Sequence, residues 1–144
     1  MTEQNFSNHA RFVPAYHFFA LPVFLINLGW AVYSLIVSRF SLGSIVALLL
    51  AAAFLVLLLY ARMFALTAQD RIIRLEERLR YERLLPADLK PRIGEFTLDQ
   101  LISLRFASDA ELPELARAVL NEKLTDRKAI KQRVNKWKAD YLRV

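Results

Sequence analysis

Two long runs without charged residues open the chain, and a single arginine separates them. The first run covers residues 12–38 and the second covers residues 40–61, with Arg39 between them. About 20 apolar residues suffice for a helix to cross roughly 30 Å of hydrocarbon, and each run is longer than this. The pattern predicts a transmembrane helical hairpin with spans at about 14–37 and 42–64.

Small and capping residues refine the expected hairpin. Pro14 suits the first turn of the first span, where its missing N–H costs nothing, and Ser41 suits the N-cap of the second. Gly43, Ala47 and Ala51 then recur every four residues. Such a stripe permits close approach of helix backbones, so we expect it to pack on the first span or on the same span of another copy.

Two residues of the first span interrupt its apolar character. Pro22 removes one backbone hydrogen bond, and Asn27 places an amide near the middle of the span. One interpretation is a kinked polar site for a ligand or ion. The other is that a neighbouring helix satisfies these groups, as is common in membrane helices.

The second span has no helix stop between Tyr60 and Leu85, so we expect it to continue as a cytoplasmic helical stalk over 65–85. Apolar residues recur along it at alternating spacings of three and four, which is typical of a packed helix seam. The seam needs a partner, which is either the chain's own tail or a second subunit. Its members are Ala61, Ala65, Ala68, Ile72, Leu75 and Leu79.

The remaining chain predicts a linker and a small helical tail. Pro86, Pro91 and Gly94 mark a linker at 86–96. Helix starts are indicated by Thr97 with Gln100, by Ser108 with Glu111, and by Thr125. One apolar face holds Leu112, Leu115, Ala116, Val119, Leu120 and Leu124, and the last helix carries Ile130, Val134, Trp137 and Tyr141.

The tail at 97–144 is too small to bury a strong core unaided, so we expect it to dock on the stalk. In this arrangement Trp137 is buried with Leu112 and Leu115 against Ile72, Leu75 and Leu79. The predicted fold is an all-α membrane protein with a two-helix hairpin, a stalk that extends its second helix, and a C-terminal three-helix unit. The segments are 1–13 (N-terminal juxtamembrane), 14–64 (hairpin), 65–85 (stalk), 86–96 (linker) and 97–144 (tail).

Charge adds an orientation. The formal net charge is +6, and the part of the chain from Arg62 onward holds 18 Lys or Arg against 13 Asp or Glu. Basic residues near span ends favour the cytoplasmic side, and two spans place both ends of the chain on the same side. We therefore expect both termini in the cytoplasm and Arg39 outside. The chain has no cysteine, which excludes disulfides, a thiolate nucleophile and a zinc site built on sulfur.

Few residues offer candidate chemistry near the membrane. His9 and His17 are the only histidines, and Glu3 is the only carboxylate near them. Metal sites need three or four ligands in fixed geometry, so we expect no metal here and no cofactor. Asp70 lies between Arg62 and Arg74 in the sequence. Such a carboxylate can handle protons at the membrane exit or latch the tail, and we favour a polar latch of these three residues.

The last helix is expected to carry a basic face that contacts anionic lipid headgroups or remains solvated near the inner leaflet. Nucleic acid is the less favoured partner, because no recognised binding motif accompanies the charge. The candidate lipid contacts are Arg127, Lys128, Lys131, Lys136 and Lys138.

The sequence has no glycine-rich phosphate loop, metalloprotease helix motif or serine elbow. We therefore expect a non-enzymatic assembly or accessory component that acts through its stalk and tail, with a protein partner or a second copy. The alternatives are a small-ligand or transport component that uses the hairpin's polar residues, and a membrane-tethered binder of anionic lipid or nucleic acid.

Several short motifs follow one another along the chain. They are Gln4-Asn5, Asn8-His9, Arg11, Pro14 and His17; Arg62-Met63-Phe64-Ala65 and Ala68-Gln69-Asp70-Arg71; Leu104-Arg105-Phe106-Ala107-Ser108-Asp109; and Ile130-Lys131, Trp137 and Ala139-Asp140-Tyr141-Leu142-Arg143-Val144. In this order they resemble a family of small bacterial two-span membrane proteins of unknown function. The resemblance covers nearly the whole chain and implies a bacterial inner-membrane protein, without implying an activity or catalytic residues.

Overall fold

The computed structural model describes residues 4–8 and 12–141. These residues form two compact units: a hairpin unit at 12–66, and a tail unit that joins 67–141 with 4–8. Throughout the described ranges every regular element is a helix, apart from one isolated β-bridge. The expected all-α fold class with one extended helix is therefore confirmed.

The hairpin unit begins with a π-helix, η1 (Ala15–Ala20), which continues directly into α1 (Leu21–Val37). Pro14 is the N-cap of η1, close to the expected helix start. Pro22 lies in the first turn of α1, immediately after the π-helix. A proline ring clashes with the carbonyl four residues earlier in a regular α-helix, and the wider π turn lies just where that clash would arise.

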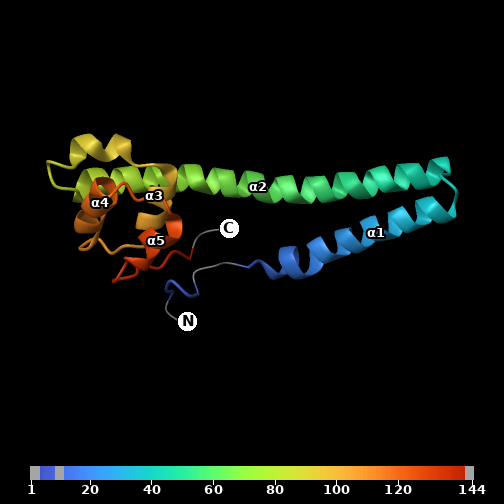
Figure 1. Ribbon diagram of the computed structural model, residues 1–144, viewed down its shortest axis with the longest axis horizontal. Helices are drawn as coiled ribbons and strands as arrows, with labels where there is room; N and C mark the ends of the chain where they lie inside the picture. The colour runs from blue at the N-terminus through green and yellow to red at the C-terminus, as the bar shows by residue number, and fades with distance from the viewer. Residues whose placement is uncertain (1–3, 9–11, 142–144) are drawn as a thin grey trace. The chain divides into compact units, whose positions relative to one another are not determined.

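α1 runs antiparallel beside the first half of α2 (Leu42–Leu84) within the hairpin unit (Figure 1). The Phe24 and Phe54 rings stack with their centroids 5.8 Å apart, and the Tyr16 hydroxyl donates to the carbonyl of Leu58 at 3.3 Å. Ala31 and Ala51 are buried at the contact. These pairs fix the register of the two helices.

Only one member of the expected small-residue stripe packs on the first span, and packing of the stripe on another copy stays a prediction. Ala51 is buried, but Gly43 and Ala47 are exposed. A Cβ built on Gly43 would meet no atom within 4 Å, so no close backbone approach occurs there. The contact face passes through Ser44 instead, which is one residue, or about 100° of helix rotation, from Gly43.

The turn between the two helices contains Arg39 and Phe40, both in the left-handed region with φ of 52° and 62°. Ser41 occupies the expected N-cap position, because the backbone N–H of Ser44 donates to its Oγ at 3.3 Å. α2 then continues without a break for 43 residues. Ala15–Val37 and Leu42–Leu84 are long and apolar enough to cross a membrane, judged by length and composition alone.

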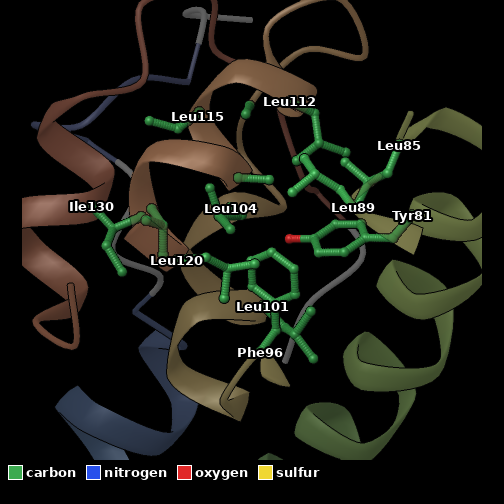
Figure 2. Packing of buried hydrophobic residues seen from close by; sticks show 13 residues of the cluster. Tyr81, Leu85, Leu89, Phe96, Leu101, Leu104, Leu112, Leu115, Leu120 and Ile130 are labelled. Atoms are coloured by element: carbon green, nitrogen blue, oxygen red, sulfur yellow. The ribbon is translucent and has the colours of Figure 1, made fainter. Parts of the chain in front are cut away.

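The tail unit packs short helices on the second half of α2. They are η2 (Lys90–Glu95), α3 (Leu98–Leu104), α4 (Leu112–Asn121) and α5 (Arg127–Gln132). Figure 2 shows their common core, with the ring of Tyr81 from α2 reaching in among leucines from the other elements. The core consists of Tyr81, Leu85, Leu89, Phe96, Leu101, Leu104, Ala107, Leu112, Leu115, Ala116, Val119, Leu120 and Ile130.

The segment expected as a linker at 86–96 contributes to this core. It forms η2, and it buries Leu89 and Phe96 at 1% and 5% exposure. The Phe96 ring meets the Tyr81 ring edge to face, with centroids 5.1 Å apart. Pro86 follows the end of α2 and Pro91 lies in the first turn of η2, while Leu89 before η2 and Phe96 after it close the core.

Local capping decides where the short helices begin. The Thr97 and Gln100 capping box is present in both directions, as the sequence predicts. The Ser108 and Glu111 box is wrong, because the Glu111 carboxylate accepts instead from the backbone N–H groups of Asn135 and Lys136. α5 is capped by Asp126 rather than by Thr125, with the Ala129 N–H donating to the Asp126 carboxylate at 2.8 Å.

The last helix ends at Gln132, so the expectation of a helix reaching Tyr141 is wrong. The following chain is drawn into extended pairing, in which the Lys138 N–H donates to the Phe106 carbonyl at 2.6 Å and Ala107 bridges Trp137. The Trp137 ring stacks on Phe106, with centroids 4.5 Å apart and planes inclined by 18°. Pairing with the Phe106 segment thus replaces the expected helical face.

The tail also docks on a different face of α2 from the expected one. Ile72, Leu75 and Leu79 are 57%, 61% and 59% exposed, so Trp137 is not buried against them. The buried side chains of this part of α2 are Ile73, Glu77, Arg80 and Tyr81, and Leu85 is buried directly after the helix. At 100° per residue these centre on the side of the helix nearly opposite the three exposed residues, which we call the exposed stripe.

A matched pair of substitutions tests which face packs. We expect Leu104→Ala, in the core, to destabilise the tail unit by about 2 to 5 kcal/mol, because it leaves a cavity. The same change at exposed Leu75 should cost no more than about 0.5 kcal/mol. Urea unfolding of the full chain with Trp30→Phe, in a detergent excess that keeps the chain monomeric, measures both through the fluorescence of Trp137. A larger loss for Leu75→Ala than for Leu104→Ala would contradict the observed docking face.

Candidate functional site

A buried arginine links α2 to the chain segment that follows α3. Arg80 lies on the docked face of α2, one residue before Tyr81, and its side chain is 5% exposed. Its guanidinium donates to the Ala107 carbonyl at 2.6 Å and to an Asp109 carboxylate oxygen at 2.9 Å. It also forms an ion pair with Glu77 at 3.2 Å. One side chain therefore joins the helix to both the backbone and a carboxylate of the tail.

The two carboxylates around Arg80 have opposite environments. Burial raises the pKa of Glu77 above its ordinary value of 4.5, and the neighbouring Arg80 charge only partly opposes this effect. The hydrogen bond from Arg80 lowers the pKa of Asp109 below its ordinary value of 3.8. Burial also raises the pKa of the Tyr81 phenol well above 10, so this hydroxyl stays protonated. Burial thus disfavours the ionised form of Glu77, whereas Arg80 stabilises the ionised form of Asp109.

A second arginine fastens the C-terminal segment. Arg105 forms an ion pair with Asp140 at 3.2 Å, and its guanidinium lies 4.5 Å from the centroid of the Phe106 ring. The Gln4 amide reaches the same place from the other end of the chain, accepting from the Asp140 N–H at 2.8 Å and donating to the Asp140 carbonyl at 3.3 Å. The N-terminal and C-terminal segments are therefore held together within the tail unit.

A cavity of about 390 Å³ lies beside these two ion pairs, against α2. Its wall combines apolar, acidic and basic groups from α2 and from the C-terminal segment, and includes Ile73, Glu77, Arg105, Lys138, Asp140 and Tyr141. Arg105 of this wall already contacts Asp140, and Arg80, which pairs with Glu77 of the wall, contacts Asp109 and the Ala107 carbonyl. The arrangement serves to clamp the tail onto α2, and we call Glu77, Arg80, Asp109, Arg105 and Asp140 the arginine clamp.

The predicted polar latch is not formed as expected. Arg62 belongs to the hairpin unit, where its guanidinium lies 5.8 Å from the Tyr16 ring centroid. Asp70 and Arg74 belong to the tail unit, and within the described ranges no ion pair joins them. The latch exists ten residues further along α2, at Arg80, where a buried position makes the interaction with the tail far less screened than on an exposed helix surface.

The predicted basic face is divided between two elements. Arg127, Lys128 and Lys131 lie on α5, whereas Lys136 and Lys138 lie on the extended segment that follows it. Arg127 pairs with Asp99, Lys131 lies 5.4 Å from the Phe106 ring centroid, and Lys138 lies 3.9 Å from Asp109. Three of the five cations therefore already interact with the tail.

The structure places the residues of the candidate polar site of the first span on α1 and directly before it. Asn27 is exposed on α1, and Pro22 occupies the first turn of that helix. His17 accepts or donates through Nδ1 at the Val13 backbone, while His9 lies outside the described residues. In the described part of the chain no group of three or more His, Asp or Glu is placed to hold a metal ion.

Sequence reasoning missed the arginine clamp because it assigned the wrong face of α2 to the tail. A signal was present: Glu77, Arg80, Tyr81 and Leu84 recur with Ile73 at helical spacing, so charged and aromatic residues share one face. The apolar stripe seemed the better docking face because it carries no charge. The charges on the true face are satisfied only by groups that come from distant parts of the tail, which local pattern cannot reveal.

The pH dependence of tail stability tests the clamp. Because the folded-state pKa of Glu77 is raised, proton uptake stabilises the tail below pH 4.5, and this contribution is lost as pH rises through the folded-state pKa. Glu77→Gln is permanently neutral and lacks it. As pH is lowered from about 7 to about 5, the unfolding free energy of wild type should therefore increase relative to that of the variant.

Urea unfolding of both full-length proteins at each pH measures this difference. The opposite contribution of Asp109, present above pH 3.8 and lost as pH falls through its lowered pKa, lies outside the measured range. Parallel pH profiles for the two proteins would show that Glu77 is not strained by burial.

Comparison with known proteins adds a family but no activity. No match was found among curated proteins or among solved structures. A family model matches residues 1–144 and is described as a family of unknown function. Because this model spans the full length, the chain belongs to the family of unknown function DUF6526.

Proposed function

We propose that this protein is a two-span protein of the bacterial inner membrane that acts by association with a protein partner rather than by catalysis. The hairpin unit anchors it, and the stalk and tail form its cytoplasmic working part. The observation that carries the proposal is the exposed stripe of Ile72, Leu75 and Leu79, which remains uncovered although the tail docks on the same helix.

Support for the membrane anchor comes from length and surface. Ala15–Val37 and the first half of α2 are long enough to cross the hydrocarbon, and most of their large apolar side chains are exposed. Water disfavours such a surface, whereas lipid does not. Basic residues concentrated after Arg62 support cytoplasmic termini, with the Arg39 turn on the outer side.

Support for association comes from the tail unit. The exposed stripe places three large apolar side chains at spacings of three and four on one helix face. Contiguous exposed apolar patches of this kind mark interaction sites more often than isolated exposed leucines do. The tail itself is already closed around its own core, so it has no need of this face for its own packing.

The orientation can be tested directly because the chain contains no cysteine. Single cysteines replace exposed Ser41, in the turn, and exposed Glu114, on α4. In spheroplasts, a membrane-impermeant thiol reagent should label Ser41→Cys and leave Glu114→Cys unlabelled until the membrane is permeabilised. Labelling of Glu114→Cys before permeabilisation would refute the proposed topology.

Association is tested by charging the exposed stripe. Leu75→Glu with Leu79→Lys should abolish co-purification of a partner or a second copy in mild detergent, because it would bury unpaired charge in the interface. Arg74→Glu on a neighbouring exposed face, and His9→Ala with His17→Ala, should leave co-purification intact. Intact assembly in the stripe variant, with loss of a bound ligand in the histidine variant, would instead support the ligand-binding alternative.

A further inference from the structure

The heptad positions of α2 divide cleanly between the tail and the exposed stripe. With Ile72 and Leu79 at position a and Leu75 at position d, the residues buried by the tail fall at positions b, c and f. These are Ile73, Glu77, Arg80, Tyr81 and Leu84, of which Leu84 is partly buried. The a and d positions therefore remain available for another helix after the tail has docked.

Ala68 takes the preceding d position and is also exposed. At its C-terminal end the stripe stops at Glu82, which occupies position d. The neighbouring Arg78 and Arg83 are both positively charged. The uncharged seam in the tail unit is thus short and runs from Ala68 to Leu79.

We propose that the partner on this face is a second copy of the same chain, with the two α2 helices parallel and in register. This inference rests on the proposed function, because two copies inserted in one membrane with the same topology have parallel α2 helices. A two-fold axis along the seam would place Leu75 of each copy opposite Leu75 of the other.

Charges beside the seam favour the parallel arrangement. Arg71 lies at position g and Glu76 at the following e position, and both are exposed. In a parallel pair, a g residue faces the next e residue of the other helix, so within the seam Arg71 of each copy meets Glu76 of the other. Beyond Leu79 the same rule places Arg78 opposite Arg83 of the other copy, and this repulsion ends the seam there. In an antiparallel pair, g faces g, and Arg71 would meet Arg71 or Arg78. Neither Arg71 nor Glu76 has an ion pair inside the described part of its own chain.

The size of the seam explains why the partner should share the membrane. Three large apolar side chains from each copy bury on the order of 600 Å² in total, if each contributes roughly 100 Å². Stable interfaces between soluble proteins bury about 1,200 to 2,000 Å². A seam this small needs the high effective concentration that two-dimensional confinement provides. A second copy, which carries the same anchor and the complementary charges, satisfies this need.

Cysteine cross-linking of the full chain in its own membranes tests the proposal. Ala68→Cys, Leu75→Cys and Leu79→Cys are made singly, with Arg74→Cys, at exposed position c, as the matched control. We expect all three seam variants, but not the control, to form disulfide-linked dimers on mild oxidation. Ala68 and Leu79 are about 16 Å apart along the helix, so an antiparallel pair cannot bring every seam cysteine opposite its twin.

Charge reversal provides an independent arm on the Leu75→Cys background. Arg71→Glu and Glu76→Arg should each reduce the cross-linked fraction about threefold to tenfold, since each replaces two attractive pairs with two repulsive ones. The double reversal should restore it. An unchanged cross-linked fraction in both single reversals and in the double reversal would contradict the parallel register.

The outcomes separate this proposal from the one on which it rests. Cross-linking of Leu75→Cys to a different polypeptide would overturn the second copy but keep the association function. Self-linking at only one seam position would overturn the parallel arrangement. Absence of any seam cross-link, together with unchanged co-purification by Leu75→Glu with Leu79→Lys, would overturn both proposals. Protease resistance of the tail in each variant confirms that it has folded.

Discussion

The buried guanidinium of Arg80 holds the tail of this protein to its long helix. It contacts a carboxylate on its own helix, a second carboxylate beyond α3, and the carbonyl oxygen of Ala107. Desolvating an arginine is costly, and the cost is offset only when its donors find partners with good geometry. Because the partners come from distant parts of the chain, the clamp forms only when the tail is correctly docked.

Docking by a charged face has a consequence for the rest of α2. The face that carries Glu77 and Arg80 is satisfied inside the chain, so the apolar face with Leu75 and Leu79 remains uncovered. A tail that docked on the apolar face would lose the contacts of Arg80 with the Ala107 carbonyl and the Asp109 carboxylate. The tail therefore covers the face of Arg80 and leaves the face of Leu75 exposed.

The tail unit is small, and it closes its core by recruiting segments that have no regular structure. Leu89 and Phe96 come from the turns around η2, and Trp137 packs on Phe106 from an extended strand-like segment. Gln4, near the N-terminus, adds two hydrogen bonds to the backbone of Asp140. Such contributions compensate for short helices, because a unit of this size buries too little apolar surface through helix packing alone.

The sequence by itself determined the all-helical class, the two long apolar helices, and the continuation of the second helix into a charged segment. These follow from run length, from the absence of Pro and Gly between Tyr60 and Leu85, and from helical spacing, all of which are local. The Thr97 capping box was readable for the same reason, since its two hydrogen bonds lie within one turn.

Only the tertiary structure decided which face of α2 the tail covers, where the last helix ends and which arginine forms the clamp. From residue spacing alone, the face of Leu75 and the face of Tyr81 are both possible docking faces for the tail. The choice depends on whether Arg80 finds the Ala107 carbonyl and Asp109. Likewise, α5 ends at Gln132 because Glu111 and Phe106 capture the backbone that follows it. Long-range hydrogen bonds of this kind leave no periodic trace in the sequence.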